Sequence, residues 1–137
     1  MPISFSILSD RDLALVVYEG HITVEERAEV VANVVRHRNF RPDQMHLVDL
    51  SGVTGWEPAL EDAVMPGEVR RDWMRQARET LCVYYAPTPA GQALAEILAR
   101  AWQGIPGVVP IVLDDEAEAL AILGQTELSV SELPRAA

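Results

Sequence analysis

The chain has 137 residues, of which 49% are hydrophobic, and this size suits one ordinary domain with a sizeable core. Its formal net charge of -10 argues against nucleic acid and anionic membranes as partners, because both are bound through clustered cations. Three histidines and one cysteine cannot build the usual Cys/His zinc cages, so we expect no metal and no other cofactor.

The start of the chain lacks the basic residues and apolar run of a signal peptide, and a lone cysteine cannot form an internal disulfide. We therefore expect a cytoplasmic protein without membrane insertion. Cys82 lies in the apolar run 80–84, which predicts a buried, unreactive thiol. All 11 basic residues are arginine, and alanine is abundant, which is typical of GC-rich coding and indicates a bacterial source.

The first elements are an antiparallel hairpin followed by a helix. Residues 3–7 alternate between apolar and polar, residues 13–18 form a fuller apolar run, and the polar segment 9–12 between them is typical of a turn. Thr23 and Glu26 have the spacing of a capping box, in which a hydroxyl and a carboxylate satisfy unpaired backbone donors. A helix is therefore expected from residue 24, with valines and alanines on its buried face.

The middle of the chain is less regular. Residues 45–54 form an apolar strand that ends in Asp, Ser and Gly, as strands of a parallel sheet do where they enter a loop. The stretch 55–65 can start a helix at Ala59, and the apolar stripe of residues 69–77 predicts a helix that includes Trp73. Trp73 is expected to be a core residue.

The second half of the chain alternates strands and helices. Residues 81–85 form a strand, after which Thr88 can cap a helix whose clear apolar stripe reaches Trp102, expected in the core. Residues 108–113 form a last strand, in which Pro110 removes a ladder donor and favours an edge position.

A final short helix follows this strand. Asp114 or Asp115 is expected to cap it, and Gly124 to end it. The order β-β-α-β-α-β-α-β-α predicts an α/β fold with a mixed, mostly parallel sheet of about five strands and helices packed on it. We expect one domain over residues 1–124 and a C-terminal tail over residues 125–137.

The element order, the segment from Gly20 to Thr23 and the strand from Leu47 to Val53 resemble the STAS-like domains. Within this group, the chain is most similar to the SpoIIAA-like branch, which is related to anti-sigma-factor antagonists, and the resemblance spans about residues 3 to 124. It implies a mostly non-catalytic protein, either a partner in a regulatory switch or, through kinship with Sec14-type domains, a protein that binds an apolar ligand.

One departure from the regulatory members concerns their phosphorylated serine. In those proteins an Asp-Ser-Ser-Gly segment follows the Asp-Leu-Ser strand, whereas this chain has Glu57, Pro58, Ala59 and Leu60 there. A phosphate would gain from backbone donors at a helix start, but no hydroxyl stands there to accept it. We therefore expect no phosphoregulation of the usual kind; Ser51 and Thr54, which lie nearby, are weaker substitutes.

A functional surface is expected where the carboxyl ends of the parallel strands meet, because the loops beyond them converge at one edge of the sheet. The loops 51–58 and 86–88 and the residues Asp114 and Asp115 would gather there. Trp56 belongs to no periodic face, and with Met65, Trp73, Tyr85 or Trp102 it could line a pocket or contact patch. The candidate ligand or partner residues are Asp49, Ser51, Thr54, Trp56, Glu57, Tyr85 and Thr88.

Three functions are compatible with these residues. The first is a non-catalytic module that acts through contact with a protein partner or with a second copy of itself. The second is a carrier of a small apolar ligand in a pocket near Trp56. The third is an enzyme that uses Asp49, Asp114 and Asp115 as paired carboxylates, but no nucleophile elbow or positioned histidine accompanies them, and we expect no enzyme.

The tail offers a separate indication of self-association. Residues 127–131 alternate like a strand, and we expect the tail to pack on its own domain or on a neighbouring subunit, for example along a sheet edge. A homodimer is therefore expected.

Overall fold

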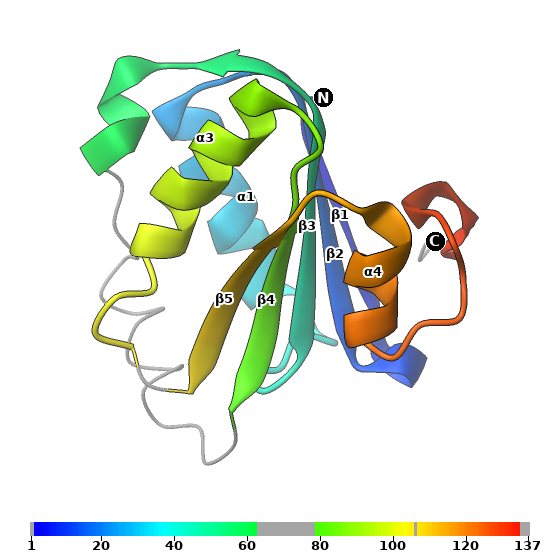
Figure 1. The fold of residues 1–137 in the computed structure, drawn as a ribbon. Coiled ribbons are helices and arrows are strands. Elements are labelled where there is room, and N and C mark those ends of the chain that lie inside the picture. Colours follow the sequence, from blue (N-terminus) through cyan, green and yellow to red (C-terminus); the bar gives the residue numbers. More distant parts are fainter. Residues whose placement is uncertain (1, 63–78, 106, 135–137) are drawn as a thin grey trace.

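The computed structural model describes residues 2–62, 79–105 and 107–134. Five strands form one mixed sheet in the order β1-β2-β3-β4-β5 (Figure 1). The first two strands are antiparallel, and the following strands run parallel to β2 and to one another. The strands are β1 (Ile3–Leu8), β2 (Leu13–Ile22), β3 (Met45–Trp56), β4 (Thr80–Tyr85) and β5 (Val108–Leu113). The predicted α/β fold and its opening hairpin are confirmed.

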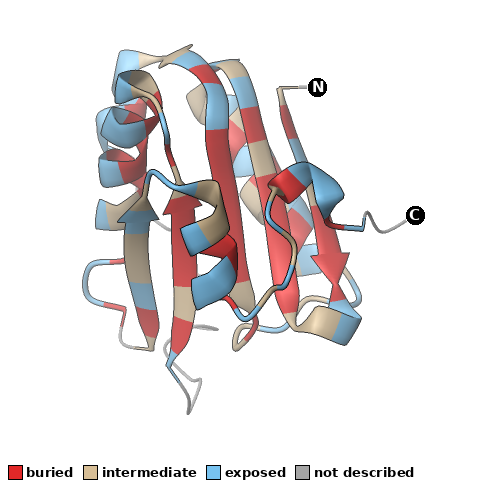
Figure 2. Ribbon diagram, turned by 45° about the vertical axis from the view of Figure 1, so that its right-hand side comes forward, coloured by how far each residue is buried: buried red, intermediate tan, exposed pale blue. Residues whose placement is uncertain are grey.

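Helices cover both faces of this sheet. The helices α1 (Val24–Arg36) and α3 (Pro89–Arg100) lie on one face, and α4 (Glu116–Ile122) lies on the other (Figure 1). Each face carries its own hydrophobic core, and Val130 and Leu133 of the tail also cover the α4 face. The middle strands are therefore largely buried, whereas β5 is much more exposed (Figure 2).

The capping box predicted before α1 is present. Glu26 N donates to Thr23 Oγ1 at 3.1 Å, and Thr23 N donates to Glu26 Oε1 at 3.0 Å. These bonds satisfy two backbone donors that the first turn would otherwise leave open. Val30 and Val34 point into the core, so the apolar face of α1 fixes how the helix lies on the sheet.

The start of α3 also follows the prediction. Thr88 is the N-cap, and its Oγ1 accepts a hydrogen bond of 3.0 Å from Gly91 N, with Pro89 at the first helical position. Gly91 lies so close to β3 that a Cβ atom built on it would be 2.9 Å from Leu50 O. The helix therefore reaches this close to the sheet only because residue 91 has no side chain.

The strand β3 is longer than predicted, which corrects the expected loop at residues 51–58. Residues 51–56 continue the strand and pair with the second half of β2, as far as Ile22 opposite Trp56. Two register shifts, between Val17 and Glu19 and between Gly20 and His21, each give β3 one extra residue. Such bulges bend and twist a strand, so the pairing continues although the alternation of side chains is broken.

The stretch after β3 also differs from the expected helix. Residues Pro58–Asp62 form a 3-10 helix, with Leu60 fully buried as its anchor. The rest of this region, including Met65, Trp73 and the predicted helix over residues 69–77, lies outside the described residues. Cys82 and Trp102 are buried, as predicted.

The predictions for the last strand and helix are confirmed. β5 lies at an edge of the sheet, and Asp115 caps α4 by accepting a hydrogen bond of 2.9 Å from Glu118 N. Gly124, just beyond the helix, has a φ of 74°, which places it in the left-handed region that glycine adopts readily.

The described part of the tail, residues 125–134, packs on its own sheet and is not a strand over residues 127–131, which corrects the expected alternation. Glu127 forms two hydrogen bonds with the guanidinium of Arg11, at 2.7 and 2.9 Å. This contact lowers the pKa of Glu127 below its usual value. A short 3-10 helix, Val130–Glu132, follows. Val130 and Leu133 are buried in the α4-side core, so side-chain packing holds this segment in place.

Candidate functional site

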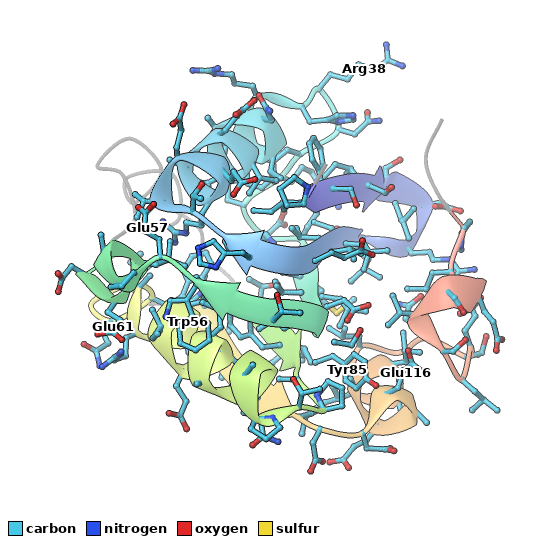
Figure 3. All side chains as sticks on the ribbon, turned by 90° about the horizontal axis from the view of Figure 1, so that it is seen from above. Arg38, Trp56, Glu57, Glu61, Tyr85 and Glu116 are labelled. Carbon is cyan, nitrogen blue, oxygen red and sulfur yellow. The ribbon has the colours of Figure 1, made fainter. Side chains whose placement is uncertain are left out.

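The residues predicted to share one rim fall into two separate groups, because β3 runs on beyond the ends of β4 and β5. Pairing between β3 and β4 stops where Asp49 lies opposite Tyr85, but β3 continues beside β2 as far as Trp56. Figure 3 shows Trp56 and Glu57 on one side of the molecule and Tyr85 with Glu116 on the other. The predicted site residues therefore do not surround a single pocket.

The first group lies on the α4 side of the sheet. Asp49 is only 8% exposed, and its Oδ1 accepts a hydrogen bond of 2.9 Å from Ser51 N. The pKa of Tyr85 is raised above its ordinary value, first by partial burial and then by the carboxylates of Glu116, Asp49 and Asp115. Tyr85 is thus a neutral phenol beside acidic groups, suited to donate a hydrogen bond rather than to accept a proton.

The second group lies where β3 ends. Trp56 is half-buried and packs against the core between the sheet and α1 and α3. Glu57 N donates a hydrogen bond of 2.8 Å to Ile22 O, which ties the turn to the end of β2. The indole of Trp56 therefore covers one end of this core.

The hydroxyl residues of the predicted site have different surroundings. Ser51 and Thr54 are exposed on β3, whereas the Thr88 hydroxyl oxygen accepts the capping hydrogen bond from Gly91 N. The role of Thr88 in the structure is therefore to cap α3, as its sequence position predicted.

Two of the three carboxylates considered for catalysis serve local structure, and the third, Asp114, is exposed after β5. Asp49 accepts a backbone N–H from Ser51, and Asp115 accepts one from Glu118. Among the described residues, no three His, Cys, Asp or Glu side chains are placed to hold a metal ion together.

A small cavity of about 70 Å³ lies between α1 and the sheet. Most of its wall is aliphatic and comes from valines of α1 and from side chains of β2, β3 and β4. Polar groups also reach it, and the described residues that bring them are Tyr18, Arg27, His46, Cys82, Tyr84 and Trp102. Trp56 is not among the described lining residues, and the tryptophan at this cavity is Trp102.

Burial keeps most of these polar groups uncharged at neutral pH. It raises the pKa of Tyr18 and of Cys82 to about 12 and the pKa of Tyr84 well above its ordinary value. Burial also lowers the pKa of His46 to about 4. Each shift has desolvation as its largest cause, because a charge in an apolar core loses its hydration. The Cys82 thiol therefore stays protonated, as an unreactive core cysteine does.

The two edges of the sheet differ in how they meet solvent. In the β4–β5 ladder, Thr80 N donates to Gly107 O and Ala86 N to Leu113 O. Because bonding alternates along a parallel strand, the odd-numbered residues of β5 bond to β4 and the even-numbered ones face outward. Pro110 is the middle outward residue and has no N–H, so it interrupts the row of donors at this edge.

The opposite edge, β1, has no such interruption. Glu19 N donates to Pro2 O at 2.6 Å, which sets the bonding pattern of the β1–β2 hairpin. The alternation then directs the backbone N–H and C=O groups of Ile3, Phe5 and Ile7 to the outer edge. In the described part of the chain no strand lies beside them, and β1 has no charged residue, proline or bulge.

A groove of about 320 Å³ runs between this edge and α1. Its described lining comes from the β1 side and from one stripe of the helix, and we call it the edge groove. The lining residues are Pro2, Ile3, Ser4, Phe5, Glu26, Glu29, Val30 and Asn33. At its far end the rings of Phe5 and His37 meet edge to face, with their centroids 6.0 Å apart.

Neither the cavity nor the edge groove was predicted from the sequence. The polar residues at the cavity come from β2, α1, β3, β4 and the end of α3, and nothing in their spacing connects them. The signal for the edge groove was present in part, since residues 3–8 contain none of the charges or prolines that usually protect an edge strand.

None of the helices in the part of the chain described above combines the length and apolarity that crossing a bilayer requires. Comparison of the chain with protein-family models gives no match, and comparison with curated protein sequences gives none either.

Proposed function

We propose that this protein is a non-catalytic binding module that acts through contact with another polypeptide, and that its architecture is STAS-like. The observation that carries the proposal is the open edge of β1 beside the edge groove. An extended segment can add to such an edge as a further strand, with main-chain hydrogen bonds for affinity and side chains in the groove for specificity.

The opposite edge of the sheet, β5, supports β1 as the binding edge. Proteins usually protect exposed strand edges, because an unprotected edge pairs with other chains. In this protein Pro110 interrupts the edge of β5, whereas β1 keeps three consecutive outward positions available. The difference between the two edges supports the proposal that a partner binds at β1.

The surroundings of the acidic residues support a function without catalysis. The carboxylates of Asp49 and Asp115 accept backbone N–H groups nearby, so each is already engaged in shaping a turn or a helix end. Residues 57–60, which stand where the regulatory STAS-like proteins carry their switch serine, follow the end of β3 and enter a 3-10 helix. A switch controlled by phosphate at a helix start therefore has no counterpart there.

Site-specific photo-crosslinking in the host cell tests this proposal. A photoreactive residue at Asn33, which is exposed and lines the edge groove, is expected to form a covalent adduct with a polypeptide. The same residue at Glu118, which is exposed on α4, serves as the matched control. Equal labelling at both positions, or labelling at Glu118 alone, would contradict protein contact through β1.

The cavity under α1 favours a second function, the binding of a small apolar molecule. At about 70 Å³ it is far smaller than typical ligand pockets of roughly 300–1,000 Å³, so a larger ligand would enter only if α1 moved away from the sheet. Native mass spectrometry of protein purified gently from its host tests this function. A bound mass of a few hundred daltons (on the order of a typical pocket ligand) that is released on denaturation would support it.

A further inference from the structure

We infer that the partner at the edge groove is a second copy of this chain, whose β1 pairs antiparallel with β1 and joins the two sheets into one. This inference rests on the proposed function, because it names the polypeptide that adds to β1. It differs from a dimer formed through the C-terminal tail, since that tail packs on the α4 face of its own sheet.

The hydrogen-bonding pattern of β1 allows only a narrow choice of register. The outward-facing residues are Ile3, Phe5 and Ile7, and in an antiparallel pair the outward positions must face each other. Of the twofold-symmetric registers, only one pairs all three outward residues, and it places Phe5 opposite Phe5 of the second copy and Ile3 opposite Ile7. The twofold axis of the dimer then passes beside Phe5, where the two residues exchange both of their backbone hydrogen bonds.

The charges along α1 are complementary under the same symmetry. Glu26, Glu29 and Asn33 line the edge groove, and Arg36 continues this stripe one turn further along the helix. The stripe is therefore acidic at its start, neutral at Asn33 and basic at its end. Two copies of α1 that meet antiparallel around Asn33 place acidic groups opposite basic ones at both ends.

The spacing of these charges fits the pairing. Glu29 lies four residues before Asn33 and Arg36 three residues after it, which is about 6 and about 4.5 Å along the helix axis. Glu29 of one copy therefore lies near the level of Arg36 of the other. Arg38 follows the helix and projects into solvent (Figure 3), which adds a further positive charge at this end.

The strand and the helix place the twofold axis independently at the same part of the molecule. The register of β1 puts it at Phe5, and the change of charge along α1 puts it at Asn33. Both residues line the edge groove, so one axis satisfies both requirements. A heterologous strand would need only the open edge and would leave the symmetry of the α1 charges unexplained.

The charges beside the edge groove differ from those of the chain as a whole. A net charge of -10 per chain opposes self-association at most surfaces. The surface beside the edge groove is an exception, because Glu26 and Glu29 are balanced by Arg36 and Arg38. This balance is what a surface that meets its own copy requires.

Charge exchange between two variants tests the pairing of Glu29 with Arg36. In a dimer of Glu29→Arg chains, and in a dimer of Arg36→Glu chains, like charges face each other twice. Each variant alone is expected to dimerise roughly tenfold to a hundredfold more weakly than the unmodified protein. An equimolar mixture of the two variants restores both opposite-charge pairs, so we expect a heterodimer of close to normal affinity, measured by sedimentation velocity and native mass spectrometry.

The matched control is Glu96→Arg, which makes the same change of charge at an exposed position of α3. Its dimer affinity should stay within about threefold of normal, since long-range effects of one exposed charge are largely screened at physiological salt. Because Glu29 and Arg36 are exposed, the substitutions should leave the fold intact, and circular dichroism checks this.

Residue-resolved hydrogen exchange tests the pairing of β1 without any substitution. Ser4 and Ser6 face β2 in the bonding pattern, so their amides should be protected at every protein concentration. The Phe5 amide faces outward and should become protected only as the concentration rises through the dimer Kd. Phe5→Pro removes this donor and should weaken the dimer roughly tenfold or more, whereas Phe5→Leu keeps the donor and should have a smaller effect.

The outcomes separate this inference from the proposed function. Two results would contradict a second copy as the partner. One is a chain that stays monomeric at high concentration. The other is a dimer whose affinity is changed neither by the charge-exchange variants nor by Phe5→Pro. If Asn33 still crosslinks to a different polypeptide in cells, the proposed function survives that result. A dimer in which the mixed variants recover affinity and Phe5 gains protection would support the inference.

Discussion

Trp102 donates a hydrogen bond of 2.9 Å from its indole Nε1 to the hydroxyl oxygen of Tyr84, inside the core between the sheet and the helices α1 and α3. Both side chains are buried, and Tyr84 lies on β4 while Trp102 follows α3. The bond therefore joins β4 to the segment that follows α3, at the wall of the cavity.

Replacing Tyr84 with Phe should destabilise the fold by about 1–3 kcal/mol, because it removes the buried hydrogen bond between the Tyr84 hydroxyl and the Trp102 indole. Denaturant unfolding measures the free-energy difference. The matched control is Tyr85→Phe at the next, half-exposed position, which should change stability by no more than about 0.5 kcal/mol. Similar losses for the two variants would contradict the importance of the Tyr84–Trp102 bond.

The free energy of unfolding should decrease as the pH is lowered, over a pH range set by the pKa of His46. Its pKa is lowered to about 4 in the folded protein by burial, against about 6.5 in the unfolded chain. The unfolded state therefore binds the proton first, and stability is fully present above pH of about 6.5 and is lost as pH falls to about 4. The total loss from this residue is on the order of 3 kcal/mol.

The pH effect is measured as a difference between variants, because carboxylates also titrate below pH of about 5. Urea unfolding of His46→Gln should show a smaller decline of stability between pH of about 6.5 and about 4 than the unmodified protein. His21→Gln, at an exposed histidine, should follow the unmodified curve. Parallel curves for the unmodified protein and His46→Gln would contradict the assignment.

Gly91→Ala should destabilise the protein by about 1–3 kcal/mol, although the same change inside a free helix would stabilise it by about 1 kcal/mol. The reason is the approach of α3 to β3, where the new Cβ would meet Leu50 O at 2.9 Å. Thermal and chemical unfolding measure whether Gly91→Ala lowers or raises the free energy of unfolding. Ala93→Gly at an exposed position of α3 provides the comparison and should cost only the helix propensity of about 1 kcal/mol. A Gly91→Ala protein that is more stable than the unmodified one would show that α3 can shift away.

The same Leu→Ala substitution at two positions of the tail tests how much its packing contributes to stability. Leu133 is 3% exposed and belongs to the α4-side core, whereas Leu128 is 71% exposed. Leu133→Ala should cost about 2–4 kcal/mol of unfolding free energy, because it opens a cavity beside the sheet. Leu128→Ala should cost less than about 0.5 kcal/mol. Equal effects in denaturant titrations would mean that the tail does not contribute to the core.

Pro110→Val should promote association beyond the dimer. The substitution restores the middle outward N–H of β5 and so opens the second edge of the sheet. Multi-angle light scattering at increasing concentration is expected to show a rising mass for this variant. Pro87→Val changes an exposed proline outside the strands and should leave the mass unchanged. A constant mass for Pro110→Val would mean that the proline is not what protects this edge.

The sequence alone determined the features that depend on neighbouring residues. The capping box of Thr23 and Glu26, the Thr88 and Asp115 caps and the opening hairpin all follow from local hydrogen bonding and apolar periodicity. The edge position of β5 follows from Pro110, because the loss of one backbone donor is a property of that residue wherever it stands.

The tertiary structure decided where the candidate site residues lie. β3 continues beside β2, through two bulges, beyond the end of β4, so Trp56 and Tyr85 do not converge as predicted. The cavity around Tyr84, His46 and Trp102 and the edge groove between β1 and α1 exist only after distant segments have packed. Local patterns specify which residues form a strand or a helix, but the register, bulges and relative placement of these elements depend on long-range contacts that no local pattern contains.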